Sequence, residues 1–206
     1  MSDTPPPYPP EHDIVAFDFD GTITTTDSFV VFLRYLARHR FRASMLAAWY
    51  PLLAYPFHRN RGRLKSQLLT LAWGGISRSE ATALAEDFAH TTLPHYVRPQ
   101  ALEEIQTHQG AGRLVCLVSA SPDLYLRPWA AQLGVNIVLA SRLIEAEDGT
   151  LPGPLLGENC RKAEKVRRLE DYFGGPIKLH SAYGDTTGDT EMLTIAQHAH
   201  FKPFRK

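Results

Sequence analysis

The sequence lacks an excess of either charge, a cysteine pattern and an apolar run long enough to cross a membrane. Its 22 basic and 22 acidic residues cancel, so overall charge gives no sign of a nucleic-acid or polyanion partner. The cysteines, Cys116 and Cys160, lack CxxC or Cys/His spacing, which fits a reducing, cytoplasmic compartment. Residues 43–57 are uncharged but contain prolines, and the run is shorter than the ~20 apolar residues of a membrane-spanning helix.

A signal peptide is not expected either. The first 12 residues are polar and rich in proline, without the basic and then apolar order of a secretory signal, so they are predicted to be a disordered lead-in. No internal repeat is visible along the 206 residues. This length holds one core, or one core with a small inserted unit. The sequence leaves both a monomer and a dimer open.

Short apolar runs alternate with helical segments along most of the chain. The runs typical of buried strands cover residues 14–17, 114–118, 135–140 and 177–183. Strands that alternate with helices form a parallel sheet with helices on both faces. The sequence therefore predicts an α/β fold with a Rossmann-like parallel sheet. Residues 142–157 are expected to form a hairpin that turns at Asp148-Gly149.

The long stretch between the first two predicted strands is helical. Apolar residues recur there at helical spacing, and Ser77 followed by Glu80 is the signature of a helix start. No strand pattern appears before Gly112. We therefore expect residues 24–110 to form an inserted helical cap over the sheet, and residues 13–23 and 111–206 to form the core.

Two carboxylates, Asp18 and Asp20, follow the first predicted strand and stand directly before Gly21. A turn or a cap alone would explain an Asp-Gly pair. Side chains two residues apart on a strand, however, lean to the same side, and two like charges held together need a positive partner. A hard cation such as Mg²⁺ prefers carboxylate oxygens. The pair therefore predicts a metal site with further ligands elsewhere in the chain.

Other reactive side chains also stand near the ends of predicted strands, where ligands of open α/β sheets bind. They are Ser119, Lys162, Lys165, Asp185 and Asp189. Together with the first two carboxylates, they supply a nucleophile, a proton carrier, cation ligands, and a hydroxyl and an ammonium for phosphoryl oxygens. Backbone N–H groups near Gly21 and Thr22 would add an anion-binding nest.

Four short motifs carry a family resemblance. The segments "DFDGT", "VSAS", "RKAEKV" and "GDTTGD" occur in this order, and together they resemble the four motifs of the haloacid dehalogenase-like phosphatase superfamily. The helical insertion is similar to the C1-type cap of subfamily IB, which contains phosphoserine phosphatase. Other stretches resemble bacterial phosphoserine-phosphatase-like proteins and the C-type phosphatidylglycerophosphatases.

The resemblance implies a Mg²⁺-dependent phosphomonoester hydrolase that forms an aspartyl-phosphate. Asp18 would be the nucleophile, and Asp20 would be the general acid and then the base. Asp18, the backbone carbonyl of Asp20, and Asp185 would hold Mg²⁺. Asp189 would be a further ligand or would support one. Ser119 would donate a hydrogen bond to the phosphoryl group.

Two positions are left between alternatives. Lys165 fits the pattern of the bacterial proteins and Lys162 fits the spacing of phosphoserine phosphatase, so either could bind phosphate, and Lys165 is favoured. Asp27 stands where phosphoserine phosphatase has a glutamate that faces the amino end of its substrate. An aspartate at this position could equally cap a helix.

Residues 43–65 bear on the choice of substrate. Their uncharged run is followed by a basic cluster that includes Arg63, and such a segment could lie at a membrane interface. The substrate would then be a lipid phosphate resembling phosphatidylglycerophosphate, and the protein would contact the inner membrane face through its cap. The alternative is a buried cap helix with a solvated basic loop, which favours a small soluble phosphomonoester.

Two non-catalytic functions compete with hydrolysis. A phospho-acceptor that resembles a response-regulator receiver also uses an acidic cluster, a hydroxyl and a lysine, but it has no large insertion and needs no acid at Asp20. A lipid-surface binding module with a vestigial site would bind vesicles without releasing phosphate. The intact motifs argue against both.

Overall fold

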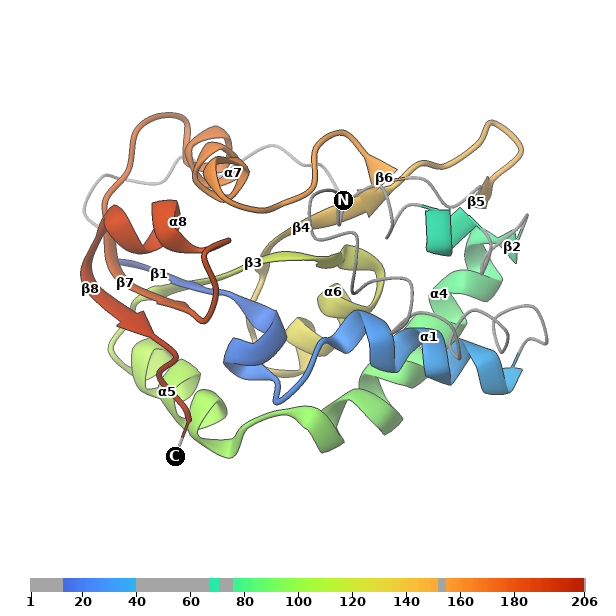
Figure 1. Ribbon diagram of the computed structural model, residues 1–206, viewed down its shortest axis with the longest axis horizontal. Helices are drawn as coiled ribbons and strands as arrows, with labels where there is room; N and C mark the ends of the chain where they lie inside the picture. Colours follow the sequence, from blue (N-terminus) through green and yellow to red (C-terminus); the bar gives the residue numbers. More distant parts are fainter. Residues whose placement is uncertain (1–12, 40–66, 71–75, 152–154, 206) are drawn as a thin grey trace.

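A six-stranded sheet forms the centre of the protein. The computed structural model describes residues 13–39, 67–70, 76–151 and 155–205. The strands of the sheet are β1 (Ile14–Phe17), β3 (Leu114–Pro122), β4 (Ile137–Leu143), β6 (Leu155–Leu156), β7 (Leu179–Gly184) and β8 (Ala196–Phe201). Their order is β6-β4-β3-β1-β7-β8 (Figure 1). β1 is parallel to both neighbours, and β6 is antiparallel to β4. The predicted, mostly parallel sheet is confirmed.

Helices cover both faces of this sheet. The described helices include α1 (Ser28–His39), α4 (Arg78–Asp87), α5 (Pro99–Gly110), α6 (Asp123–Gln132), α7 (Ala163–Phe173) and α8 (Thr190–Thr194). In Figure 1, α7 and α8 lie on one side of the sheet, and α5 and α6 lie on the other. Val15 and Phe17 of β1 pack in the same cluster as Ile105 of α5, whereas Ala16 packs with Leu169 of α7. Because successive side chains of a strand point to opposite faces, β1 is buried on both.

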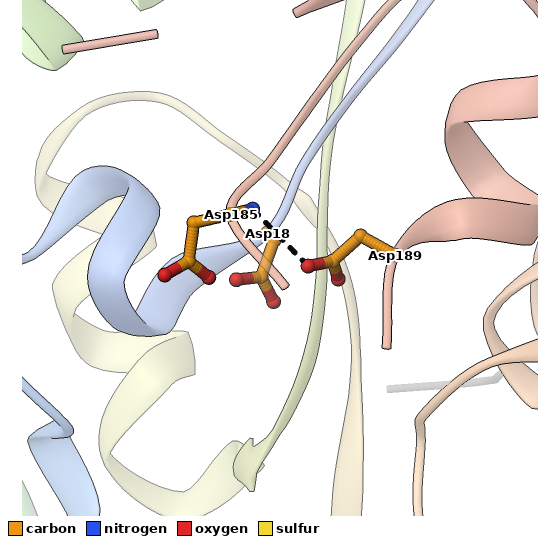
Figure 2. Close-up of side chains that lie close together, drawn as sticks. All are labelled: Asp18, Asp185 and Asp189. Carbon is orange, nitrogen blue, oxygen red and sulfur yellow. Dashed lines mark hydrogen bonds between the residues drawn. The ribbon is translucent and has the colours of Figure 1, made fainter. Parts of the chain in front are cut away.

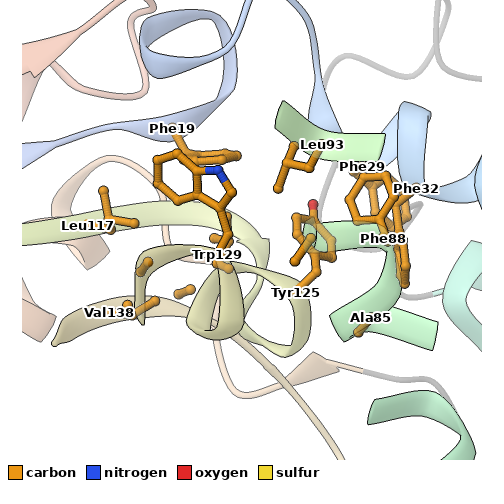
Figure 3. Packing of buried hydrophobic residues seen from close by; sticks show 14 of the residues in the cluster. Phe19, Phe29, Phe32, Ala85, Phe88, Leu93, Leu117, Tyr125, Trp129 and Val138 are labelled. Carbon is orange, nitrogen blue, oxygen red and sulfur yellow. The ribbon is translucent and has the colours of Figure 1, made fainter. Parts of the chain in front are cut away.

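An aromatic cluster ties the residues between β1 and β3 to α6 (Figure 3). α4 continues into two short helical turns, η2 (Phe88–Thr92) and η3 (Leu93–Tyr96). The ring of Phe32 in α1 lies 4.8 Å from the rings of both Phe88 and Tyr125, and the latter two rings are 5.2 Å apart. Phe19 contacts Trp129 of α6 edge to face at 4.9 Å. Large aromatic side chains contribute much of the burial in such a core, so α1 is firmly attached to the sheet layer.

α5 lies in the stretch that the sequence assigns to the cap, yet it packs on the sheet. His108 Nε2 is 2.8 Å from the hydroxyl of Tyr183 in β7, and that hydroxyl donates to Glu104 Oε1 at 2.6 Å. The ring of Phe17 lies 6.1 Å from the ring of His108. These contacts attach α5 to the central strands. The division into a core of residues 13–23 and 111–206 and a cap of residues 24–110 stays a prediction.

The expectation of a strand-free stretch before Gly112 is wrong. A short strand, β2 (Ile76–Ser77), pairs antiparallel with β5 (Thr150–Leu151). The turn at Asp148-Gly149 is present, with Gly149 at a φ of +75°. The strand after the turn, however, pairs with β2, while β6 pairs with β4. Two-residue strands have no readable alternation, and their pairing depends on tertiary context.

The chain leaves the sheet layer after β1 and returns before α5 along two adjacent connections. Thr24 and Val97 form an isolated antiparallel bridge. On either side of it, Thr25 N donates to Tyr96 O at 2.8 Å, and Arg98 N donates to Ile23 O at 2.8 Å. The two connections therefore run side by side, in opposite directions, near the carboxyl end of β1.

Candidate active site

Asp18 begins the turn η1 (Phe19–Ile23) directly after β1. Its backbone N–H donates to Tyr183 O at 2.8 Å, which continues the pairing with β7. The side chain is buried, and Oδ1 lies 2.5 Å from Lys165 Nζ. Thr22 Oγ1 donates to Oδ2 at 3.3 Å. The Asp18 carboxylate is thus held from two sides at the carboxyl end of the central strand.

Lys165 of α7 is the buried cation of the site. Its side chain is 2% exposed, and Nζ also lies 2.7 Å from Asp189 Oδ1. An ammonium has three N–H donors, and these two ion pairs use two of them. Lys162 precedes α7 at a φ of +57° and is exposed. The structure therefore brings Lys165, and not Lys162, to the carboxylates.

Asp189 organises the loop that follows β7. Its Oδ2 accepts hydrogen bonds from the backbone N–H groups of Asp185 (3.2 Å) and Thr186 (3.0 Å) and from Thr186 Oγ1 (3.2 Å). A Cβ on Gly184 would lie 2.5 Å from Asp189 Cβ, so only glycine allows this approach. Burial raises the pKa of Asp189, but the ion pair with Lys165 and the hydrogen bonds outweigh it and leave that pKa lowered.

Asp185 has two differently placed carboxylate oxygens. Oδ2 faces Gly21, where an added Cβ would come within 2.4 Å of it, and it lies 2.5 Å from Arg205 Nη2. Gly21 has a φ of +78°, a conformation that favours glycine. Oδ1 is buried and has no hydrogen-bond partner in the described part of the chain. Nothing in the motifs points to Arg205, which sequence reasoning missed.

The carboxylates of Asp18, Asp185 and Asp189 converge on one point (Figure 2). One oxygen from each lies within 4.8 Å of the others, and all three side chains are buried. Burial raises the pKa of Asp18 to about 7. The Lys165 ammonium opposes that rise, and the nearby Asp189 carboxylate adds to it.

The donor set fits a hard divalent cation. It consists of carboxylate oxygens, which such ions prefer, and it contains a buried oxygen, Asp185 Oδ1, that lacks a partner among the described residues. A polar atom buried without a partner is costly. A cation held by the three carboxylates would favour the ionised form of Asp18, and a bond to Oδ1 would give that oxygen a partner.

Asp20 stands apart from this cluster and is held by hydroxyl groups. Oδ1 accepts hydrogen bonds from the backbone N–H of Ser28 (2.8 Å) and from its Oγ (2.5 Å), and Ser121 Oγ donates to Oδ2. The Tyr125 hydroxyl lies 2.9 Å from Ser28 Oγ. Sequence reasoning missed these three partners. Ser121 belongs to the "VSAS" motif, whereas Ser28 and Tyr125 carried no signal.

The remaining candidates differ in what they contact. Ser119 is buried in β3, just before the pairing with β4 shifts register. Its Oγ accepts a bond from Ser121 N at 3.1 Å, which leaves its hydroxyl hydrogen for another acceptor. Asp27 Oδ1 accepts from Phe29 N at 3.0 Å, so Asp27 caps α1. Arg63 lies outside the described residues.

Comparisons with known proteins identify the family of the chain. A family model for haloacid dehalogenase-like hydrolases matches residues 15–194. Protein CicA of Caulobacter vibrioides is 41% identical over 192 residues, which cover 93% of this chain and 86% of that protein. Phosphoserine phosphatase SerB1 of Mycobacterium tuberculosis is 30% identical over 194 residues, which cover 87% of this chain and 61% of that protein.

A solved structure has the same fold. It is described as a phospho-aspartyl intermediate analogue of phosphoserine phosphatase and is 20% identical, with a TM-score of 0.62 over 90% of this chain and 83% of that one. Because the family model covers most of its length, the chain belongs to the haloacid dehalogenase-like hydrolase family.

Proposed function

We propose that the protein is a Mg²⁺-dependent phosphomonoesterase that acts through an aspartyl-phosphate on Asp18. One observation carries the proposal. In a chain of this hydrolase family, the buried Asp18 carboxylate pairs with the Lys165 ammonium at the carboxyl end of the central strand, and it lies within 4.8 Å of oxygens of the Asp185 and Asp189 carboxylates. A dianionic ester would be repelled by this cluster unless cations neutralise it.

Mg²⁺ would be held by Asp18, Asp185 and the backbone carbonyl of Asp20, with Asp189 in support. When bound, it would neutralise the carboxylates and the phosphoryl oxygens. Asp189 uses Oδ1 on Lys165 and Oδ2 on its own loop, which favours support over direct ligation.

The chain's own residues would carry the reaction in two halves. An oxygen of Asp18 attacks phosphorus while the bond to the leaving alkoxide breaks, and Asp20 gives that alkoxide a proton. Asp20 then accepts a proton from a water molecule, which attacks phosphorus and releases inorganic phosphate and the Asp18 carboxylate. Asp20 regains in the second half the proton that it gave in the first, and Asp18 loses the phosphoryl group that it had gained. The enzyme is thereby regenerated.

Three groups would hold the phosphoryl oxygens. Lys165 has a third N–H beyond its two ion pairs, Ser119 has its hydroxyl hydrogen, and the backbone at Gly21 and Thr22 would supply N–H groups. Donors that are already in position stabilise charge on a phosphoryl group without reorganisation. We assign phosphate binding to Lys165 over Lys162, because Lys162 is exposed.

The substrate we propose is a small phosphomonoester resembling phosphoserine. SerB1, a relative at 30% identity, is named a phosphoserine phosphatase. Asp27 adds no support, since it caps α1. The lipid-phosphate alternative rests on residues 43–65, which lie outside the described residues. In the part of the chain that the structure describes, no helix is both long and apolar enough to span a membrane.

A substrate panel tests the proposed function. Phosphoserine, sugar phosphates, phosphatidylglycerophosphate in mixed micelles and p-nitrophenyl phosphate would be assayed for phosphate release with Mg²⁺ and with EDTA. We expect hydrolysis with Mg²⁺ and near-complete loss with EDTA that excess Mg²⁺ reverses. A receiver-like or lipid-binding module would release no phosphate from any of them, and equal rates with EDTA would contradict the metal assignment.

Gly21→Ala is expected to displace the Asp185 carboxylate, although Gly21 itself has no side chain. The added Cβ would meet Asp185 Oδ2 at 2.4 Å, and the φ of +78° disfavours alanine. We expect kcat/KM and Mg²⁺ affinity to fall by about 10- to 100-fold, the usual cost of displacing a metal ligand.

Gly112→Ala is the matched control. Gly112 also has a positive φ, of +72°, but its added Cβ would have nothing within 4 Å. Both variants share the backbone strain, and only the first disturbs Asp185. Equal loss of Mg²⁺ affinity in the two variants would show that the close approach to Asp185 is unimportant.

A further inference from the structure

Residues 202–205 run past the carboxylate cluster and are fixed at three points. Lys202 N donates to Gly184 O at 2.8 Å. The Phe204 ring stacks on the Tyr183 ring with centroids 5.7 Å apart and an interplanar angle of 9°. Phe204 O accepts from Arg98 Nη1 at 3.2 Å. None of residues 202–205 belongs to the four motifs, yet the segment is attached both to β7 and to the start of α5.

This attachment places the Arg205 guanidinium on one oxygen of a metal-ligand candidate. Nη2 lies 2.5 Å from Asp185 Oδ2 and 3.5 Å from Gly21 O. Gly21 faces the same oxygen, because a Cβ built on it would be 2.4 Å from Oδ2 but 3.3 Å from Oδ1. Oδ2 is therefore enclosed by Gly21 and Arg205.

The other oxygen of Asp185 makes no such contact in the described part of the chain. Oδ1 is buried and has no hydrogen-bond partner within the described ranges. Figure 2 shows the Asp185 carboxylate beside that of Asp18, and one oxygen of each belongs to the group that lies within 4.8 Å. One oxygen is thus occupied by a cationic side chain, and the other is free for a cation.

We propose that Arg205 is a positioning residue that makes Asp185 a one-oxygen ligand and thereby favours Mg²⁺ over Ca²⁺. The inference rests on the proposed function, since it concerns the same cation site. Mg²⁺ requires octahedral geometry with short bonds, to which a carboxylate contributes one oxygen. Ca²⁺ accepts six to eight oxygens and often takes both oxygens of one carboxylate. With Oδ2 bound to Arg205, Asp185 cannot offer the two-oxygen mode.

Selectivity separates this role from a simple charge effect. The Arg205 guanidinium repels any divalent cation nearby, so its removal also changes affinity through charge alone. That effect is the same for Mg²⁺ and Ca²⁺, which carry equal charge. The ratio of their dissociation constants therefore reports on the geometry of Asp185 and not on the net charge of the site.

The test is calorimetric titration of the full chain with MgCl₂ and with CaCl₂. In Arg205→Met, we expect the ratio of the Ca²⁺ Kd to the Mg²⁺ Kd to fall by about tenfold, the lower end of the cost of losing a group that orients a metal ligand. Arg205→Lys keeps a cationic donor and should retain most of the ratio. Arg167→Met is the matched control, because Arg167 is 58% exposed on α7 and pairs with Glu164 and Asp171.

The outcomes are distinct. A ratio in Arg205→Met within twofold of the parent would overturn the proposal, whether the two Kd values move together or stay fixed. If Arg205→Met did not melt cooperatively, Arg205→Lys and Arg205→Ala would decide, and equal ratios in both would contradict a role that depends on the bond to Oδ2. If the parent chain hydrolyses phosphate esters with Mg²⁺ but the ratio is unchanged in Arg205→Met, this inference is refuted and the proposed function stands. If the parent chain binds neither cation, both are refuted.

Discussion

Asp18→Asn is expected to lower kcat by roughly four orders of magnitude or more, as loss of a covalent nucleophile does. The amide is nearly isosteric but uncharged and cannot attack phosphorus. The Asp18 side chain is buried beside Lys165, and Lys165 keeps its second partner, Asp189. The variant should therefore fold, which a thermal melt would check, and phosphate release with Mg²⁺ would be measured over extended incubation.

Asp171→Asn makes the same chemical change away from the site. Asp171 lies on α7 with a side chain that is 62% exposed, paired with Arg167. Exposed pairs of this kind contribute little, so we expect parent-like kcat and KM. If Asp18→Asn retained more than about a hundredth of the parent kcat, Asp18 would not be the nucleophile.

Lys165→Met is expected to have the largest effect on stability. It removes the cation that lies 2.5 Å from Asp18 and 2.7 Å from Asp189, and breaking a buried ion pair costs about 3–5 kcal/mol. Denaturant unfolding without Mg²⁺ would measure this loss. The kcat should fall as well, by about 10²- to 10³-fold, as on removal of one preorganised donor.

The pH dependence identifies the cause of that loss. Lys165 now lowers the pKa of Asp189 and limits the rise in the pKa of Asp18. Without it, the folded-state pKa of both carboxylates rises, so the destabilisation is complete above the raised pKa values and disappears as the pH falls through them toward the ordinary pKa of an aspartate. Lys162→Met, at an exposed position, should change stability by less than about 0.5 kcal/mol. The reverse ranking of the two lysines would contradict the assignment.

Ligands of open α/β sheets bind at the carboxyl ends of the strands. This rule predicted which side chains come together, but it could not predict the hydrogen bonds and ion pairs that hold them in place. Asp18 follows β1 and Asp185 follows β7, and Ser119 is the last residue of β3 before its pairing with β4 shifts register. The sheet topology therefore brings all three to one edge. Lys165 reaches the same edge because its helix, α7, packs against the face of the sheet that carries Ala16. These residues lie in local patterns, which is why the sequence sufficed for them.

Contacts between distant segments were not predictable in this way. Arg205 reaches Asp185 across 20 positions, and Tyr125 reaches Ser28 across 97. No periodic pattern in the sequence indicates either contact, because each is made by a single side chain whose direction depends on the packing around it. The pairing of β2 with β5 was missed because strands of two residues show no alternation of polar and apolar side chains. For Asp27 the sequence left two interpretations open, a residue that faces the substrate and a helix cap. The structure shows the helix cap.

Borohydride trapping tests the central claim most directly. Reduction of an aspartyl-phosphate converts that aspartate to homoserine, which peptide mass spectrometry locates. After mixing with a hydrolysed substrate and Mg²⁺, we predict homoserine at position 18 and none in the presence of EDTA. Homoserine at Asp20, Asp185 or Asp189 instead, or none at all while phosphate is being released, would contradict nucleophilic attack by Asp18.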